Sequence, residues 1–203
     1  MCLFLVNLNR MIENSLVFGR GMDEIQFPHF IWQSKTPLEA SSTTQIFLKS
    51  RPNEHWVLVG EGVAQCHAQL WTAWHSAARR QRRGTSLARS FDAEFLRYLS
   101  GTHHVSEAFK RAGLRDGDSK GCFLFLPGLE GSADSLPDVS LEATSLLTLE
   151  AASLASSMGL ALVEEPLVCH PEGAKRLGLV IEDSSRLTCD ALIGHIISAE
   201  FNS

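Results

Sequence analysis

The segment from Gly84 to Gly117 constrains the fold more than any other part of this 203-residue chain. It contains two short stretches in which apolar residues recur at the i, i+3/i+4, i+7 spacing of an amphipathic helix. Ser100-Gly101 joins the stretches, and Gly113 follows the second. Because glycine adopts a positive φ with little strain, both glycines are expected to form left-handed helix C-caps. The apolar positions are Phe91, Phe95, Leu96 and Leu99, then Val105, Ala108, Phe109 and Ala112.

The rest of the chain predicts strands that alternate with helices, as in an α/β domain. Runs of aromatic and β-branched residues bounded by Pro, Asn and Gly predict strands, and helical periodicity lies between them. The order predicts a mixed central sheet flanked by helices in a single domain over residues 25–203, with an N-terminal extension at 1–24 and a surface loop near 128–140. The predicted strands cover 27–34, 55–63, 121–126 and about 160–168, and further helices cover 64–83, 141–158 and about 186–200.

Positive charge is concentrated in the middle of the chain. The net charge of the whole chain is -5, which gives no sign of general affinity for nucleic acid. Residues 79–120, however, carry ten Lys/Arg and five Asp/Glu, so this segment is +5 and the remainder is -10. Such a distribution favours an oriented anionic partner. The run from Arg79 to Arg83 holds four arginines, more than a helix C-terminus needs, and guanidinium groups bind phosphate oxygens bidentately.

The five cysteines show no C-x-x-C spacing. Because their number is odd, the sequence indicates neither a disulfide framework nor a zinc ribbon, and it predicts reduced thiols in a cytosolic protein. The apolar run near the N-terminus is too short for a secretory signal and has no basic residue before it. No run of 18 apolar residues occurs, so a membrane-spanning helix is excluded on length. The cysteines are Cys2, Cys66, Cys122, Cys169 and Cys189.

The residues around the Ser-Gly turn resemble a known family. An Ala/Ser-Phe entry, a glutamate within an apolar helix, Ser-Gly, two polar residues, an aliphatic residue, Glu-Ala, a basic residue and glycine follow one another as in the small kinase-binding and tRNA-binding subunit of the KEOPS complex, the TPRKB type. The resemblance spans about Val57 to Phe125, and is weaker over the final helix from Arg186. Its residues are Ala88, Ser90, Phe91, Glu94, Ser100, Gly101, His103, His104, Val105, Glu107, Ala108, Lys110 and Gly113.

The resemblance implies a non-catalytic subunit of a complex that installs N6-threonylcarbamoyladenosine beside the anticodon of tRNA. In that family the subunit docks on a small atypical kinase-like subunit and recruits tRNA by its single-stranded acceptor end. The expected partners are therefore this kinase-like subunit and tRNA, in the cytoplasm and also the nucleus if the source is a eukaryote, with no cofactor, metal or membrane. Residues expected to contact tRNA are Arg79, Arg80, Arg82, Arg83, Arg89, His103, His104, Lys110 and Arg111.

The histidine pair His103-His104 has the residue types of a metal site or a catalytic base. Adjacent histidines project about 100° apart on a helix, whereas joint ligation favours i, i+4, so no metal site is expected. Cys66-His67 and Cys169-His170 lie in apolar runs, where structural thiols are favoured over a catalytic dyad. The sequence has no Gly-rich phosphate loop, H-E-x-x-H or G-x-S-x-G motif. No catalytic residue is predicted.

The predicted C-terminal helix is apolar on nearly all sides. Its apolar residues point in three directions on a helical wheel, and burial on one side cannot cover them all. Such a helix is either central in its own domain or covered by a partner, and the sequence leaves both open. In the resembling family the C-terminal part helps to hold the kinase-like subunit. The residues assigned to this interface are Leu187, Leu192, Ile193, Ile196 and Ile197.

Two other classes of function remain open at this point. An interaction module would bind an acidic protein through the same arginines without binding RNA, and an enzyme would use the histidine pair. Binding to tRNA and to a polyacidic peptide across a salt series separates the first from RNA recognition, because RNA phosphate contacts give a steep linear log-log salt dependence.

Overall fold

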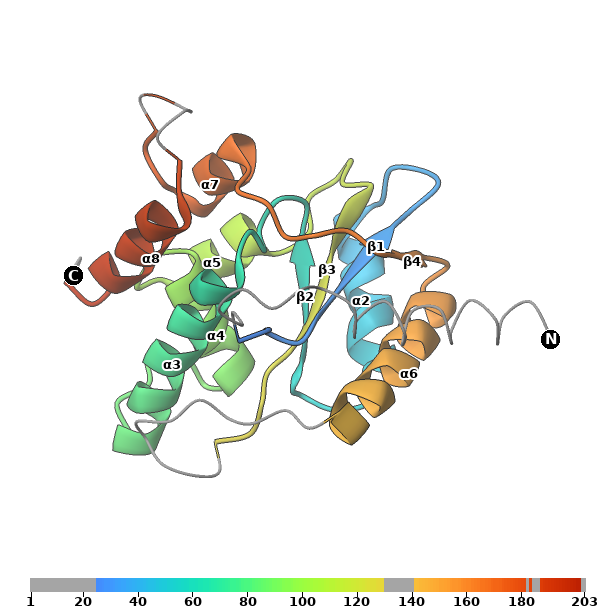
Figure 1. The fold of residues 1–203 in the computed structure, drawn as a ribbon, viewed down its shortest axis with the longest axis horizontal. Coiled ribbons are helices and arrows are strands. Elements are labelled where there is room, and N and C mark those ends of the chain that lie inside the picture. The colour runs from blue at the N-terminus through green and yellow to red at the C-terminus, as the bar shows by residue number, and fades with distance from the viewer. Residues whose placement is uncertain (1–24, 130–140, 182, 184–186, 202–203) are drawn as a thin grey trace.

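The computed structural model describes residues 25–129, 141–181, 183 and 187–201, in which a sheet separates two groups of helices (Figure 1). The strand order is β2-β3-β1-β4, and all three pairings are antiparallel. The predicted single-domain α/β class is confirmed, with strands that are antiparallel throughout rather than mixed. In chain order the described elements are β1 (His29–Gln33), α2 (Ala40–Ser50), β2 (Trp56–Gly60), α3 (His67–Arg83), α4 (Phe91–Leu99), α5 (Val105–Ala112), β3 (Lys120–Phe125), α6 (Leu141–Ser157), β4 (Ala161–Val163), α7 (Pro171–Leu177) and α8 (Cys189–Ser198).

Helices cover both faces of the sheet. Figure 1 shows α2 and α6 covering one face and α3, α4 and α5 covering the other. Successive residues of a strand point to opposite faces, so Val57 packs with the α3 and α4 side chains, whereas Trp56 and Leu58 pack with α2 and α6. On β3, Leu124 and Phe123 divide in the same way. The strands are therefore apolar at nearly every position, which is the pattern by which the sequence predicts them.

Helices α4 and α5 form the predicted helical hairpin. Gly101 has φ +58, so the left-handed cap expected in the Ser-Gly turn is confirmed. The corresponding expectation for Gly113 is wrong, because its φ of -68 and ψ of 177 are extended. A Cβ on Gly113 would lie 2.4 Å from the carbonyl oxygen of Phe109. The absent side chain therefore allows the chain to leave close to the last helical turn.

Helices α2 and α7 are two elements that the sequence analysis does not predict. The Glu39 carboxylate caps α2 by accepting hydrogen bonds from the backbone N–H groups of Ser41 (3.1 Å) and Ser42 (2.8 Å). Helix α7 begins at Pro171 and ends before Gly178, whose φ is +98. The ends of both helices are thus marked by local signals, a capping carboxylate for α2 and Pro171 and Gly178 for α7.

Cys66 and Cys189 form a disulfide bridge, which corrects the expectation that the thiols are reduced. The two residues are 123 positions apart in the sequence, and they meet because α8 packs against α3. Neither an odd cysteine count nor local spacing can reveal such a pair. Cys122 and Cys169 are free. Cys2, the extension 1–24 and residues 130–140 of the predicted loop lie outside the described residues.

Candidate partner-docking and RNA-binding site

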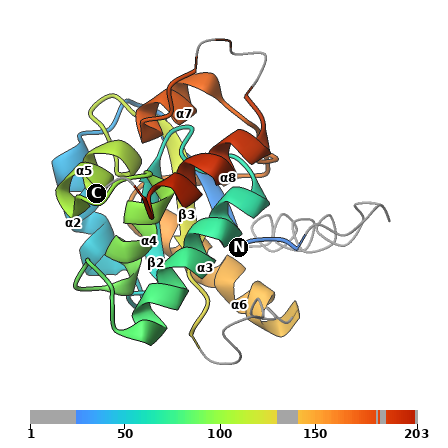
Figure 2. The same ribbon diagram turned by 90° about the vertical axis from the view of Figure 1, so that its left-hand side faces the viewer.

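Helix α8 lies along α3, on the side of the sheet that α3, α4 and α5 cover (Figure 2). Its inner face is formed by Leu192, Ile196 and Ala199, each at most 1% exposed. Ile196 and Ala199 belong to the same core cluster as Leu70 and Trp74 of α3. Two residues of the predicted partner interface, Leu192 and Ile196, therefore lie against this chain's own core.

The outer face of α8 carries a second apolar row. Ile193 is half-buried, Ile197 is 47% exposed, and Phe201 is 78% exposed. The chain continues in tight turns after the helix, since the N–H groups of residues 199–201 donate to carbonyls three positions earlier. Ile193 and Ile197 lie one helical turn apart, and Phe201 follows in the turns after α8; these three residues are named here the α8 stripe. Phe201 is absent from the predicted interface, which ends at Ile197.

Polar contacts fix the C-terminal end of α8. The Tyr98 hydroxyl donates to Oε1 of Glu200 at 2.5 Å, and Nη2 of Arg80 donates to Oε2 at 3.3 Å. Nε of Arg80 also donates to the Tyr98 hydroxyl at 2.7 Å. Partial burial acts to raise the pKa of Glu200, but the Tyr98 hydrogen bond and the guanidinium groups of Arg80 and Arg79 outweigh it, so this pKa is lowered. Arg80, predicted to contact tRNA, thus helps to hold α8.

A second set of contacts joins α8 to the Ser-Gly turn. Nε2 of His195 hydrogen-bonds the carbonyl of Leu177 at 3.2 Å, and burial lowers the pKa of this histidine. Nη1 of Arg111 donates to the carbonyls of Ser100 (3.1 Å) and Leu177 (3.3 Å). A Cβ on Gly101 would lie 2.3 Å from Nε2 of His195, so this position requires glycine for space as well as for its φ. Arg111 therefore holds the Ser-Gly turn and the end of α7 together, next to His195 of α8.

The buried pair Glu94–Arg97 shapes both ends of α4. Oε1 of Glu94 lies 2.7 Å from Nη2 of Arg97, and neither side chain is exposed. Oε2 of Glu94 accepts hydrogen bonds from the backbone N–H groups of Leu87 (3.1 Å) and Ala88 (2.9 Å). Nη1 of Arg97 donates to the carbonyl of Thr102 at 3.1 Å. One ion pair thereby fixes the loop before α4 and the turn after it, which accounts for the glutamate in the family-like pattern.

The predicted RNA-binding arginines lie around the loop 84–90. Arg79, Arg83 and Arg89 are exposed there. Arg82 is half-buried and donates to the carbonyl of Leu129 at 2.9 Å. The exposed arginines of this end are therefore Arg79, Arg83 and Arg89, named here the arginine end.

The remaining predicted RNA contacts lie on the α5 side. His104 and Lys110 are exposed, whereas Nε2 of His103 is buried with no hydrogen-bond partner among the described residues. His104 follows the end of α4 and the arginine end precedes its start, so a helix of nine residues, about 13 Å long, separates them. The structure thus divides the predicted RNA contacts into two groups.

Within the described ranges, no group of three or more His, Cys, Asp or Glu side chains could hold a metal ion. A cavity of about 220 Å³ lies beside the sheet and is lined in part by Lys120, Cys122, Glu165 and His170. Lys120 and Glu165 form an ion pair there, and burial raises the pKa of Cys122 to about 12. The thiol is therefore protonated at neutral pH and poorly suited to act as a nucleophile.

None of the described helices is long and apolar enough to cross a membrane.

Taken together, the sheet, the α4–α5 hairpin and the α8 stripe define an α/β protein with an apolar helix face at its surface. Residues 41–140 match the model of the family described as Kinase binding protein CGI-121. This stretch of the chain is similar to that family, in agreement with the residues around the Ser-Gly turn. The matched range includes the hairpin and the central strands β2 and β3, and α8 follows it. A comparison with curated proteins found no significant match.

Proposed function

We propose that this chain is a non-catalytic subunit of a KEOPS-like assembly that docks on the small kinase-like subunit and recruits tRNA. The observation that carries the proposal is the α8 stripe. It combines large, partly exposed apolar side chains with a helix that is anchored at both ends, by the Cys66–Cys189 bridge and by Glu200. An anchored helix with an apolar outer face is suited to a hydrophobic groove, because little ordering is required on binding.

The test of docking is a charge placed in the α8 stripe. Ile197→Glu should leave the domain folded, since this side chain is already 47% exposed, and surface substitutions usually change stability by about 0.5 kcal/mol or less. In a complex the same carboxylate would be buried without a partner, which costs several kcal/mol. Co-purification with the kinase-like subunit should therefore be lost.

Val180→Glu is the matched control, because Val180 is 88% exposed and lies outside α8. This variant should keep kinase binding. Circular dichroism melting of both variants separates lost binding from lost folding. Kinase binding by a folded Ile197→Glu variant at unchanged affinity would contradict docking through the α8 stripe.

The proposed recruitment of tRNA uses the arginine end, with His104 and Lys110 as a second contact. The three arginines are exposed and close to one another along the chain, and the buried carboxylate of Glu94 holds the loop that carries Arg89. Guanidinium groups neutralise phosphates and stack on bases, which suits a single-stranded acceptor end. Arg80 and Arg111 are proposed to hold the neighbouring elements in place and not to contact tRNA themselves.

The test of RNA binding avoids residues that hold the fold together. Arg83→Glu/Arg89→Glu should weaken tRNA binding roughly tenfold or more and reduce the log-log salt slope by about 1.4 to 1.8, since each lost phosphate contact removes about 0.7 to 0.9. The control Lys35→Glu/Lys49→Glu makes the same charge change on another part of the surface. Equal loss in both double variants would show a general charge effect and refute the arginine end as the site.

A second tRNA substrate tests which part of the RNA is read. Trimming the unpaired nucleotides of the acceptor end should cost about as much affinity as the double arginine change. Equal affinity for trimmed and intact tRNA would mean that the body of the tRNA is recognised instead.

A further inference from the structure

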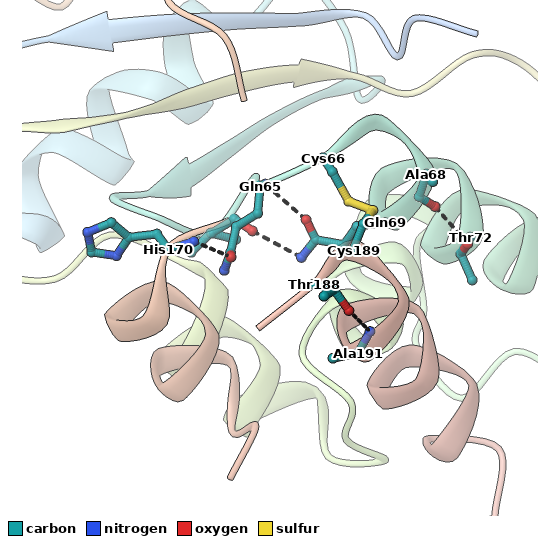
Figure 3. Close-up of a disulfide and its surroundings, with 10 residues drawn as sticks. Gln65, Cys66, Ala68, Gln69, Thr72, His170, Thr188, Cys189 and Ala191 are labelled. Carbon is teal, nitrogen blue, oxygen red and sulfur yellow. Dashed lines mark hydrogen bonds between the residues drawn. A yellow bond between two sulfur atoms is a disulfide. The ribbon is translucent and has the colours of Figure 1, made fainter. Parts of the chain in front are cut away.

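The bridge Cys66–Cys189 joins the starts of two helices. Cys66 is the N-cap of α3, and Cys189 is the first residue of α8 (Figure 3). Their Cα atoms are 6.3 Å apart, within the usual range for a disulfide. Both residues are half-buried, so the bridge lies at the margin of the core rather than inside it.

The α3 side of the bridge is held independently of it. The backbone N–H of Gln65 donates to Oε1 of Gln69 at 2.9 Å, and Nε2 of Gln69 donates to the carbonyl of Val63 at 3.2 Å (Figure 3). Oε1 of Gln65 accepts from the backbone N–H of His170 at 2.7 Å. Gln65 and Gln69 are fully buried. Opening the bridge should therefore leave Cys66 in place.

The α8 side depends more strongly on the bridge. The described polar ties of α8 to the rest of the fold, through His195 and Glu200, lie in its C-terminal half and just beyond it. At the other end, Thr188 caps the helix by accepting from the backbone N–H of Ala191 at 3.3 Å, a contact within α8 itself. Ile193 of the α8 stripe is one turn after Cys189. The position of Ile193 therefore depends on the nearby disulfide bridge.

The proposed function adds a second argument, because a cytoplasmic KEOPS-like subunit would work in a reducing compartment. Disulfides in such compartments are usually transient, catalytic or redox-sensing rather than permanent. A half-buried bridge that joins two helix ends and leaves the sheet untouched can open without unfolding the core. The other described cysteines differ, because Cys122 is buried and Cys169 is an exposed free thiol.

We propose that the Cys66–Cys189 pair is a redox-controlled lock on α8, which orders the helix when oxidised and loosens its N-terminal half when reduced. Closure occurs by two exchanges with a small disulfide such as oxidised glutathione. One cysteine thiolate attacks and forms a mixed disulfide, releasing one glutathione thiol, and the second cysteine displaces the other. The two protein thiols lose two electrons and two protons, and one small disulfide becomes two thiols. The consequence for the kinase-like subunit rests on the function proposed above.

The experiment equilibrates the full chain in glutathione buffers of graded ratio. Alkylation with a heavy maleimide, followed by gel electrophoresis, reports the state of the bridge. Amide hydrogen exchange of residues 189–201 reports the order of α8, and binding to the purified kinase-like subunit is measured in parallel. Reduction should accelerate exchange in α8 at least tenfold while exchange in α3 and α4 is unchanged. It should also weaken kinase binding about tenfold, within the usual range for coupled sites.

Two variants complete the test. Cys66→Ser/Cys189→Ser should behave as the reduced form under every condition. Cys169→Ser should keep the full redox response, and it serves as the matched control because its thiol is exposed but lies outside the bridge. Identical α8 exchange in the oxidised and reduced states would overturn the lock. Redox-dependent exchange without kinase binding in either state would support the lock and refute the proposed docking.

Discussion

Replacing Glu94 by Gln should destabilise this domain more than its small change in shape would indicate. The variant removes the negative charge beside Arg97, whose side chain is wholly buried and cannot turn towards water. Breaking a buried pair by removing one partner costs about 3–5 kcal/mol. The same carboxylate accepts from the N–H groups of Leu87 and Ala88, so the upper part of this range is expected. That loss is a large share of a typical stability of about 5–15 kcal/mol.

Urea unfolding followed by far-UV circular dichroism measures the loss. With a slope of about 2 kcal/mol per molar, a loss of about 4 kcal/mol lowers the unfolding midpoint by about 2 M. Hydrogen exchange at the amides of Leu87 and Ala88 should rise further than in α6, because their acceptor is weakened. Glu94→Gln/Arg97→Met should recover part of the stability, since it removes the uncompensated charge.

The matched control for this prediction is Glu107→Gln. Glu107 pairs with Arg111 at 2.9 Å, but the two side chains are 39% and 27% exposed. A pair of this kind is usually worth about 1 kcal/mol or less. If Glu94→Gln costs no more than Glu107→Gln, the buried pair does not hold the loop and turn around α4, and the reasoning fails.

Three further predictions use thermal or urea unfolding. Gly101→Ala should cost more than Gly84→Ala, because both positions have positive φ but a Cβ meets His195 only at Gly101; equal melting temperatures of the two variants would contradict this. Burial lowers the pKa of His195, so the unfolded chain binds its proton first and stability should fall as pH drops below about 6.5; His195→Gln should lose less stability between pH 7.5 and 5.5. The pKa of Glu200 is also lowered, so its contribution should be present above about pH 4.3 and be lost on further acidification; Glu200→Gln should show a smaller loss there.

Periodicity and glycine positions predict the parts of the fold that bury apolar surface in a regular way. Strands β2 and β3 are recognised because nearly all of their residues are apolar, and α4 because its stripe precedes a glycine with positive φ. Helix α2 is not recognised, because only Thr43 and Phe47 of its eleven residues are buried and its sequence is largely polar. A helix that buries so little has almost no periodic signal.

The site shows a different limit of sequence reasoning. The sequence predicts RNA contacts for Arg80 and Arg111 because it shows their charge, whereas their partners Glu200 and Leu177 lie far away along the chain. The same separation hides the disulfide between Cys66 and Cys189. Side chains that hold distant elements together can be distinguished from side chains that are free to bind only when the packing is known.

The short strand β4 also affects how this molecule behaves at high concentration. It contributes three residues to the sheet and is followed by Glu164, Glu165 and Pro166, all of them exposed. An incoming strand would meet two carboxylates and a residue without an N–H donor. At the opposite edge every residue of β2 is buried, and Arg51 donates to the carbonyl of Trp56. Neither edge is a ready template for fibril growth, so the molecule can display an apolar helix to a partner without also inviting strand-by-strand aggregation.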